Sequence, residues 1–166
     1  MTTDFLLWGG FALLGLVVGS FLNVVIHRLP RMLEAQWAEA IREQGPDTPT
    51  DRPSPKPFNI AVPRSHCPHC GHVLSWSENI PVLSYLVLKG RCSQCHSAIG
   101  WRYPVIELLT SVLFVWSFSQ YGMSGAALAW AGFAAALLTL AAIDADTTLL
   151  PDAITQPLVW AGLLAA

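Results

Sequence analysis

The sequence predicts an all-α, polytopic membrane protein, a helical bundle interrupted by one hydrophilic loop domain. The 166 residues are 53% hydrophobic and only 12% charged, with a mean hydropathy of +0.46, which is more apolar than ordinary soluble domains. Apolar stretches long enough to cross a bilayer recur along the chain, and all nine Lys and Arg lie between Arg28 and Arg102. This composition excludes a disordered chain and a nucleic-acid-binding protein, and it makes membrane lipid an expected partner.

The first predicted membrane helix lies in the segment 1–26. Residues 5–26 are 22 residues without a charged side chain, enough to span a bilayer. A secretory signal peptide is the competing interpretation, but it needs a basic amino-terminal region, and the only charge here is Asp4. We therefore expect a retained anchor helix. Gly15 and Gly19 give it a small-residue face, which favours packing within the bundle over docking of a substrate helix.

The predicted loop domain covers residues 27–102. Short cytoplasmic loops are enriched in Lys and Arg, so we expect this segment in the cytoplasm and the amino terminus outside. Residues 33–44 have the spacing of an amphipathic helix, with Leu33, Trp37 and Ile41 on one face. Residues 45–57 are rich in Pro, Asp, Thr and Ser, which is typical of a linker.

Three further apolar segments lie in residues 103–166. They are residues 103–118, residues 122–143 and residues 154–166. With a cytoplasmic loop domain, the turn near residues 121–124 is external and the following helix returns to the cytoplasmic face at Asp144. The last segment has only 13 residues when the sequence stops, so we expect the front part of a longer protein.

Glu107 lies inside the apolar segment 103–118. An ionisable side chain is costly there, which favours a functional role. The alternative is that Glu107 lies near the membrane interface and pairs with Arg102. The sequence leaves both interpretations open.

Two Cys-x-x-Cys pairs, Cys67 with Cys70 and Cys92 with Cys95, are separated by 21 residues. This layout is typical of a structural Zn²⁺ site closed by four thiolates. Disulfides would not persist in a reducing cytoplasmic loop, and a thioredoxin-like redox pair would not need two copies. The predicted fold is thus a helical bundle with a cytoplasmic zinc-knuckle loop domain. One neighbouring histidine could replace a thiolate, although we favour exposed positions for all four: His66, His69, His72 and His96.

Three carboxylates follow the long uncharged helix: Asp144, Asp146 and Asp152. Asp146 and Asp152 suit an interfacial loop, with Asp152 capping the next helix. Asp144 follows Ile143 directly, so we expect it at the edge of the bundle and partly desolvated. With a second carboxylate nearby, the pair could share a proton and activate water for peptide hydrolysis. One aspartate cannot do this alone.

In chain order, these residues closely resemble the type IV prepilin peptidases over nearly the whole sequence. The motifs are highly specific when taken together, although any one alone would be weak. They are residues 19–30 (GSFLNVVIHRLP), the two cysteine pairs, residues 79–85 (NIPVLSY), residues 90–92 (GRC), residues 101–104 (WRYP) with Glu107, and Ile143 and Asp144 leading to residues 150–152 (LPD).

The resemblance implies an aspartic endopeptidase of the bacterial inner membrane. It would remove the leader peptide of type IV prepilins and type II secretion pseudopilins on the cytoplasmic face. Many members then methylate the new amino terminus with S-adenosylmethionine, and the cysteine-bearing loop occurs in these bifunctional members. The family's first catalytic aspartate matches Asp144. No Gly-rich nucleotide loop is present, so an ordinary Rossmann-type cofactor site is not predicted. The resemblance alone suggests the zinc loop and the adjoining residues 19–23 (GSFLN) for methylation, without assigning single residues to the methyl donor.

One departure from the family pattern bears on activity. The family's second aspartate lies in a Gly-x-Gly-Asp motif on a later helix, and the 166 residues contain no such motif. We therefore expect a fragment of a working enzyme, in which sequence beyond Ala166 supplies the partner of Asp144. For a chain that ended at Ala166, the alternatives are a non-catalytic, zinc-stapled membrane scaffold of pilus or secretion assembly, or methyltransferase activity alone.

Overall fold

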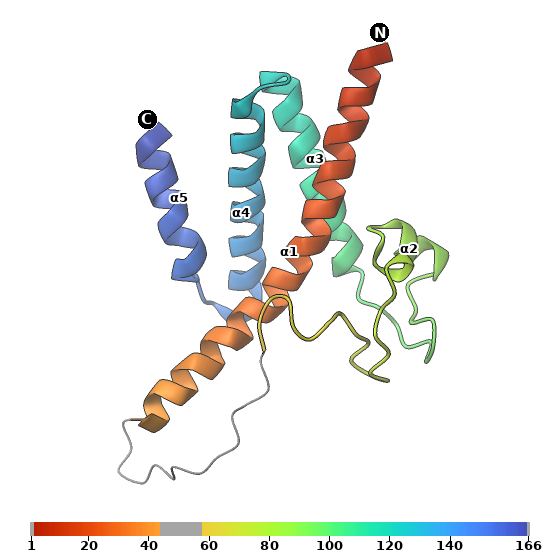
Figure 1. Cartoon of the computed structure of the whole chain (residues 1–166), viewed down its shortest axis with the longest axis vertical. Coiled ribbons are helices and arrows are strands. Elements are labelled where there is room, and N and C mark those ends of the chain that lie inside the picture. Colours follow the sequence, from red (N-terminus) through yellow and green to blue (C-terminus); the bar gives the residue numbers. More distant parts are fainter. Residues whose placement is uncertain (1, 44–57, 166) are drawn as a thin grey trace.

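The computed structural model describes residues 2–43 and 58–165, and these residues form a mostly helical structure (Figure 1). Helices α1, α3 and α4 pack together, and α5 contacts α4. The loop domain between α1 and α3 contributes two short helices and two isolated β-bridges. The predicted all-helical class is confirmed for the described residues. In chain order the elements are α1 (Thr2–Glu43), the 3₁₀ helix η1 (Ser77–Asn79), α2 (Leu83–Val87), α3 (Arg102–Tyr121), α4 (Gly125–Thr147) and α5 (Asp152–Ala165).

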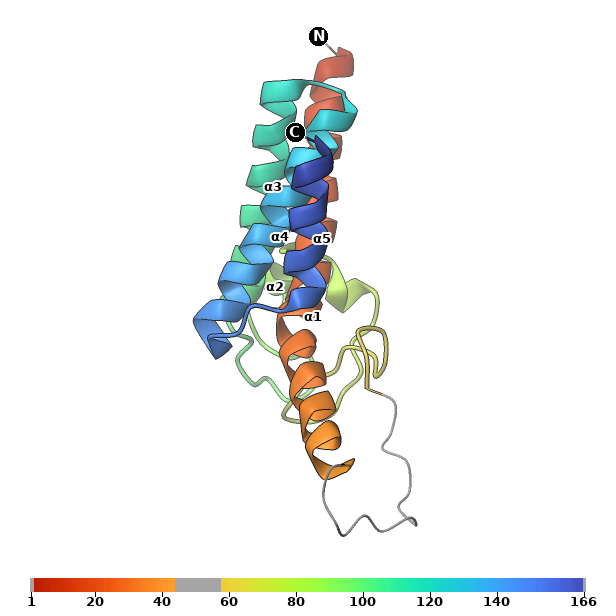
Figure 2. The same cartoon turned by 90° about the vertical axis from the view of Figure 1, so that its left-hand side faces the viewer.

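Helix α1 is longer than the sequence predicts. The expected break after residue 26 is not seen, because α1 continues through Pro30 and includes the amphipathic segment up to Glu43. A proline removes one backbone hydrogen bond and bends a helix without always ending it. The 42 residues span about 63 Å, twice the thickness of a bilayer core, so α1 extends past α4 and α5 (Figure 2). Gln44 and the predicted linker 45–57 lie outside the described residues.

Two glycines allow α1 and α3 to touch backbone to backbone. A Cβ on Gly15 would lie 2.5 Å from the Cα of Ser111, and one on Gly19 would lie 2.7 Å from the Cα of Glu107. Beside this contact, the Ser111 hydroxyl donates to the carbonyl of Ala12 on α1 at 2.9 Å. The predicted role of Gly15 and Gly19 in bundle packing is confirmed.

The helices bury small and polar side chains beside large apolar ones such as Phe114 and Ile143, and they expose many further large apolar side chains. Thr110, Ser117 and Thr139 are almost completely buried, and their hydroxyls donate to backbone carbonyls. This arrangement suits lipid, because apolar solvent covers large side chains while small residues let the backbones approach. The exposed apolar side chains include Leu13, Val17, Leu108, Val112, Trp116, Leu128, Trp130, Phe133 and Leu137.

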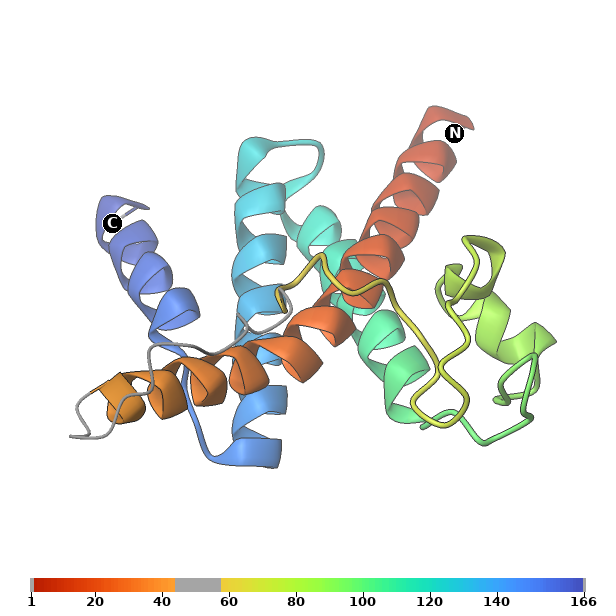
Figure 3. The ribbon, with the colours of Figure 1, turned by 60° about the horizontal axis from the view of Figure 1, so that its bottom comes forward.

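Two helices, α1 (over Phe5–Arg42) and α4, are long and apolar enough to cross a membrane by length and composition. Membrane crossing by α3 and by α5 stays a prediction. The amino terminus and the turn between α3 and α4 lie at one end of the bundle (Figure 1). The loop domain and the Asp144 end of α4 lie at the opposite end, which Figure 3 brings forward. The loop domain and Asp144 therefore share one end, as the predicted topology requires.

The close contact at Gly15 predicts an unusual response to the smallest substitution. Alanine favours a helix over glycine by about 1 kcal/mol. At Gly10, where a Cβ would meet nothing within 4 Å, Gly10→Ala should leave the melting temperature unchanged or raise it. Gly15→Ala should lower it, because α1 and α3 must move apart. Thermal unfolding of the two detergent-solubilised variants checks this, and equal melting temperatures would contradict the described contact.

Candidate functional site

Cys67 and Cys70 lie in a tight turn of the loop domain. The N–H of Cys67 donates to the carbonyl of His72 at 2.8 Å, and the N–H of Gly71 donates to the carbonyl of Cys67 at 2.9 Å. Gly71 has a φ of 72°, in the left-handed region that glycine adopts without steric cost. This turn brings the two sulfurs to one side of the loop.

Cys92 and Cys95 repeat the same turn. The N–H of Cys92 donates to the carbonyl of Ser97 at 2.9 Å, and the N–H of His96 donates to the carbonyl of Cys92 at 3.0 Å. His96 takes the place that Gly71 has in the first turn, and its φ of 56° is uncommon for a residue with a side chain. The loop domain thus contains two similar knuckles.

The two knuckles bring all four sulfurs within 4.8 Å of one another. The Sγ atoms of Cys67 and Cys95 are 3.7 Å apart, and those of Cys70 and Cys92 are 3.9 Å apart. Four sulfurs at about 2.3 Å from a tetrahedral zinc ion are about 3.8 Å apart, so the spacing fits that ion. A disulfide would need about 2.0 Å, and all four cysteines are free. The predicted gathering of these cysteines is confirmed.

Backbone amides surround the Cys67 sulfur. Hydrogen bonds from the amides of Cys70 and His69 lower the pKa of Cys67 to about 5, which favours the thiolate that binds metals. Among the described residues, the group able to hold a metal consists of the four cysteines alone. The expected exposure holds for three of the neighbouring histidines. His72 is only half-buried, and its ring contacts Glu78 at 3.2 Å.

Glu78 connects the two knuckles. Its carboxylate accepts hydrogen bonds from the Ser93 hydroxyl of the second knuckle and from the backbone N–H and hydroxyl of Ser75, which follows the first. These donors, Ser93 first, lower the pKa of Glu78 to about 2. The carboxylate therefore stays charged at neutral pH and holds both knuckles in one orientation.

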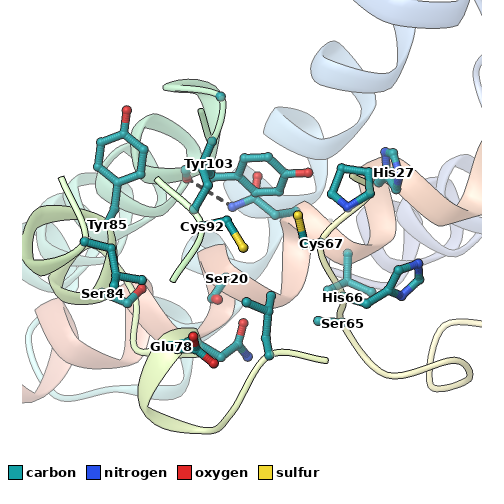
Figure 4. Close-up of a pocket in the computed structure, with 18 of the residues that line it drawn as sticks. Ser20, His27, Ser65, His66, Cys67, Glu78, Ser84, Tyr85, Cys92 and Tyr103 are labelled. Carbon is teal, nitrogen blue, oxygen red and sulfur yellow. Dashed lines mark hydrogen bonds between the residues drawn. The ribbon is translucent and has the colours of Figure 1, made fainter. Parts of the chain in front are cut away.

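A cavity of about 440 Å³ lies between α1, the loop domain and the start of α3 (Figure 4). Ser20 and His27 line it from α1, and Cys67 and Cys92 line it from the knuckles. Its α1 and α3 walls are joined where the side-chain amide of Asn23 donates to the carbonyl of Tyr103 at 3.0 Å. The volume lies in the usual range for small-molecule sites, about 300 to 1,000 Å³.

Glu107 lines this cavity from α3 and is 8% exposed. One carboxylate oxygen accepts the backbone N–H of Val82 at 2.7 Å, and Ser20 lines the same cavity from α1. Val82 has a φ of 56°, which is a genuine outlier for a β-branched residue. A pairing of Glu107 with Arg102, which the sequence left open as one of two interpretations, is not among the ion pairs of the described residues.

Arg102 instead connects α3 to the end of α4. Its guanidinium forms an ion pair with Asp146 and donates to the carbonyl of Ala142 at 2.8 Å. Which carboxylate Arg102 pairs with depends on how α3 packs against α4, and spacing along the sequence does not contain that information. The contact fixes the last turn of α4 beside the loop domain.

Asp144 lies in this last turn of α4. Its carbonyl accepts the N–H of Thr148, whose left-handed conformation ends the helix. Its side chain is exposed, so the partial desolvation that the sequence suggested is not seen in the described residues. Asp152 is the first residue of α5, in its first turn, whereas the expected cap would precede the helix.

Sequence reasoning missed the cavity and the role of Arg28 in its wall. Arg28 counted only as one of the loop charges, yet it is 8% exposed and donates to the carbonyls of Asn59 and Ile60 at 3.0 and 3.1 Å. The one available signal was its position directly after an uncharged helix, where a basic side chain can turn back toward the loop.

Comparison with known proteins identifies the chain's relatives. Residues 13–121 match the family model described as the bacterial peptidase A24 N-terminal domain. The chain is 54% identical over 150 residues to a prepilin leader peptidase/N-methyltransferase of Burkholderia pseudomallei (strain 1026b), covering 90% of this chain and 48% of that protein. It is 48% identical over 158 residues to the protein of that name from Pseudomonas aeruginosa, covering 92% and 52%.

A third relative with the same name, from Neisseria gonorrhoeae, is 48% identical over 153 residues, covering 92% of this chain and 53% of that protein. The chain thus spans about half the length of the curated relatives it matches. No solved structure matches it. The family-model match and these relatives agree, and the chain belongs to the prepilin leader peptidase family, whose amino-terminal part it resembles.

Proposed function

We propose that this chain is the amino-terminal part of a membrane aspartic endopeptidase. The enzyme cleaves the leader peptides of type IV prepilins and type II secretion pseudopilins and N-methylates the new amino terminus. The family membership and the names of the relatives support both activities. The lipid-suited surface of α1, α3 and α4 supports a place in the bacterial inner membrane, and the basic residues near the loop domain support its cytoplasmic side.

Asp144 is the proposed catalytic aspartate of this chain. The observation that carries this assignment is the attachment of the last turn of α4 to Arg102, through Asp146 and Ala142. It holds Asp144 at the end of the bundle where a cytoplasmic leader would lie, with its carboxylate exposed toward further groups. The second carboxylate comes from sequence beyond Ala166.

In the proposed mechanism the two carboxylates share one proton. The charged one accepts a proton from water as the water oxygen attacks the scissile carbonyl, and the protonated one donates to the carbonyl oxygen. Both carboxylates must therefore contact the same water and peptide bond. Asp144 alone supplies half of this arrangement.

The four cysteines hold a structural zinc ion in this proposal. Four thiolates close a tetrahedral coordination sphere and leave no position for a substrate. Zinc bound to these cysteines would join the two knuckles and hold one wall of the cavity, since Cys67 and Cys92 line it. For methylation, a bound S-adenosylmethionine would supply an activated methyl group to the amine. After this transfer the rest of the donor would leave as a neutral thioether.

Replacing Asp144 tests the peptidase assignment. In the full-length protein, Asp144→Asn should reduce leader cleavage to background, because the amide cannot accept a proton from water. Asp152→Asn is the matched control, since Asp152 is exposed in the first turn of α5 and should leave cleavage near the wild-type rate. Cleavage of a prepilin substrate in membranes measures both. Wild-type cleavage by Asp144→Asn would refute the assignment.

Zinc content tests the metal site. The purified protein should contain one zinc ion per chain, and Cys92→Ser should lose it and become more sensitive to proteolysis between residues 58 and 101. His96→Gly is the matched control in the same knuckle, because glycine tolerates the φ of 56° and His96 is not a ligand. Elemental analysis measures the zinc content of each variant. Full zinc content in Cys92→Ser would contradict the four-thiolate site.

Cys92→Ser also separates the two activities. Loss of methylation with retained cleavage would assign the loop domain to methylation. Loss of both would give the metal a general role in folding. A mass measurement of the processed substrate reads both reactions in one sample.

A further inference from the structure

Glu107 is a buried carboxylate whose charge no neighbour neutralises. Among the described residues, no Lys, Arg or His nitrogen lies within 4.0 Å of it, since the ion pairs found there are His72 with Glu78 and Arg102 with Asp146. Arg28, which lines the cavity, is held by two loop carbonyls, and Arg102 is held by the end of α4. Arg31 also lines the cavity and forms none of the ion pairs of the described residues. A buried charge is normally paired, so an unpaired one facing a cavity indicates a cationic ligand.

The backbone that holds the Glu107 carboxylate in place is strained. The hydrogen bond to Glu107 comes from the backbone of Val82, whose φ of 56° and ψ of −46° form a conformation that strongly disfavours a β-branched residue. Such strain persists where the surrounding structure enforces it, and it gathers at ligand-binding sites.

The rest of the cavity suits a ligand with a flat aromatic part. Tyr85 and Tyr103 line it from α2 and α3, and Figure 4 shows the Tyr103 ring beside Cys92, whereas the Tyr85 ring points away from the other labelled side chains. Tyr85 is packed against Gly90, where a Cβ would lie 2.9 Å from the ring, so the ring position is fixed by the knuckle. Glu78 and Arg28 also line the cavity, but Ser93 and Ser75 hold Glu78 and two loop carbonyls hold Arg28. Glu107 and the aromatic rings are left to face a ligand that carries both a planar base and a positive charge.

We propose that this cavity binds the methyl donor, a sulfonium nucleoside of the S-adenosylmethionine type, with Glu107 facing its positive charge. This inference rests on the proposed N-methyltransferase function. The donor combines an aromatic base, a permanent sulfonium charge and an ammonium group, which matches the lining. The cavity also lies close to the peptidase end of α4, because Tyr103 lines it and the adjacent Arg102 contacts Asp146.

Binding of two ligands to the full-length protein tests the proposal. S-adenosylmethionine carries the sulfonium charge and S-adenosylhomocysteine does not, while both carry the ammonium. Glu107→Gln keeps the shape of the side chain and removes its charge, and it should raise the Kd for S-adenosylmethionine about tenfold or more in equilibrium dialysis. A smaller rise for S-adenosylhomocysteine places the carboxylate at the sulfonium, and an equal rise places it at the ammonium. Either result supports the site.

Controls separate this proposal from the function on which it rests. Glu39→Gln makes the same chemical change on the exposed face of α1 and should bind both ligands like wild type. Unchanged binding in Glu107→Gln would overturn the proposed site and leave the N-methyltransferase function standing. Wild-type protein that binds neither ligand would instead remove the methyltransferase function. Zinc content and a monodisperse elution profile show whether each variant is folded.

A second variant keeps the proposal testable if Glu107→Gln does not fold. Ser84 lines the cavity from α2, and Ser84→Phe should fill part of the cavity while leaving Glu107 in place. This variant should weaken binding of both ligands. Wild-type affinity in a folded Ser84→Phe protein would contradict binding in this cavity.

Discussion

The backbone contact between α1 and α3 is the constraint on which the rest of the structure depends. Because Gly15 and Gly19 carry no side chains, the two helices approach closely enough for Asn23 to reach the Tyr103 carbonyl. The same approach places Glu107 opposite Ser20 and beneath the start of α2. The loop domain has little apolar core of its own. It is held in place by this helix contact on one side and by the four cysteines on the other.

The chemistry of the protein lies where the apolar bundle meets the loop domain. Within the helices, the buried hydroxyls donate hydrogen bonds to backbone carbonyls. Among the described residues, the buried charged side chains are those of Glu107 and Arg28. At the loop end, arginine side chains tie separate elements together, Arg28 to the loop and Arg102 to α4. The cysteine cluster, the cavity and the Asp144 turn are therefore parts of one connected region.

Much of this arrangement follows from local sequence patterns, and the remainder depends on packing. The Cys-x-x-Cys spacing predicted the metal-site geometry because a short turn fixes where two sulfurs lie. The spacing of Gly15 and Gly19 predicted a helix contact for the same local reason. The continuation of α1 through Pro30 was missed because residues on either side of it differ in polarity, which suggested two elements. The partner of Arg102 and the cavity were missed because both arise where segments far apart in sequence meet.

The account's central claim is that the loop domain and the Asp144 turn share the cytoplasmic face, opposite the turn between α3 and α4. Labelling with a membrane-impermeant maleimide in intact cells tests it most directly. Met123→Cys, in the exposed α3–α4 turn, should be labelled from outside, whereas Thr147→Cys, in the last turn of α4, should be labelled only after lysis. The wild-type protein gives the background from its own cysteines. Labelling of Thr147→Cys in intact cells, or protection of Met123→Cys, would contradict the account.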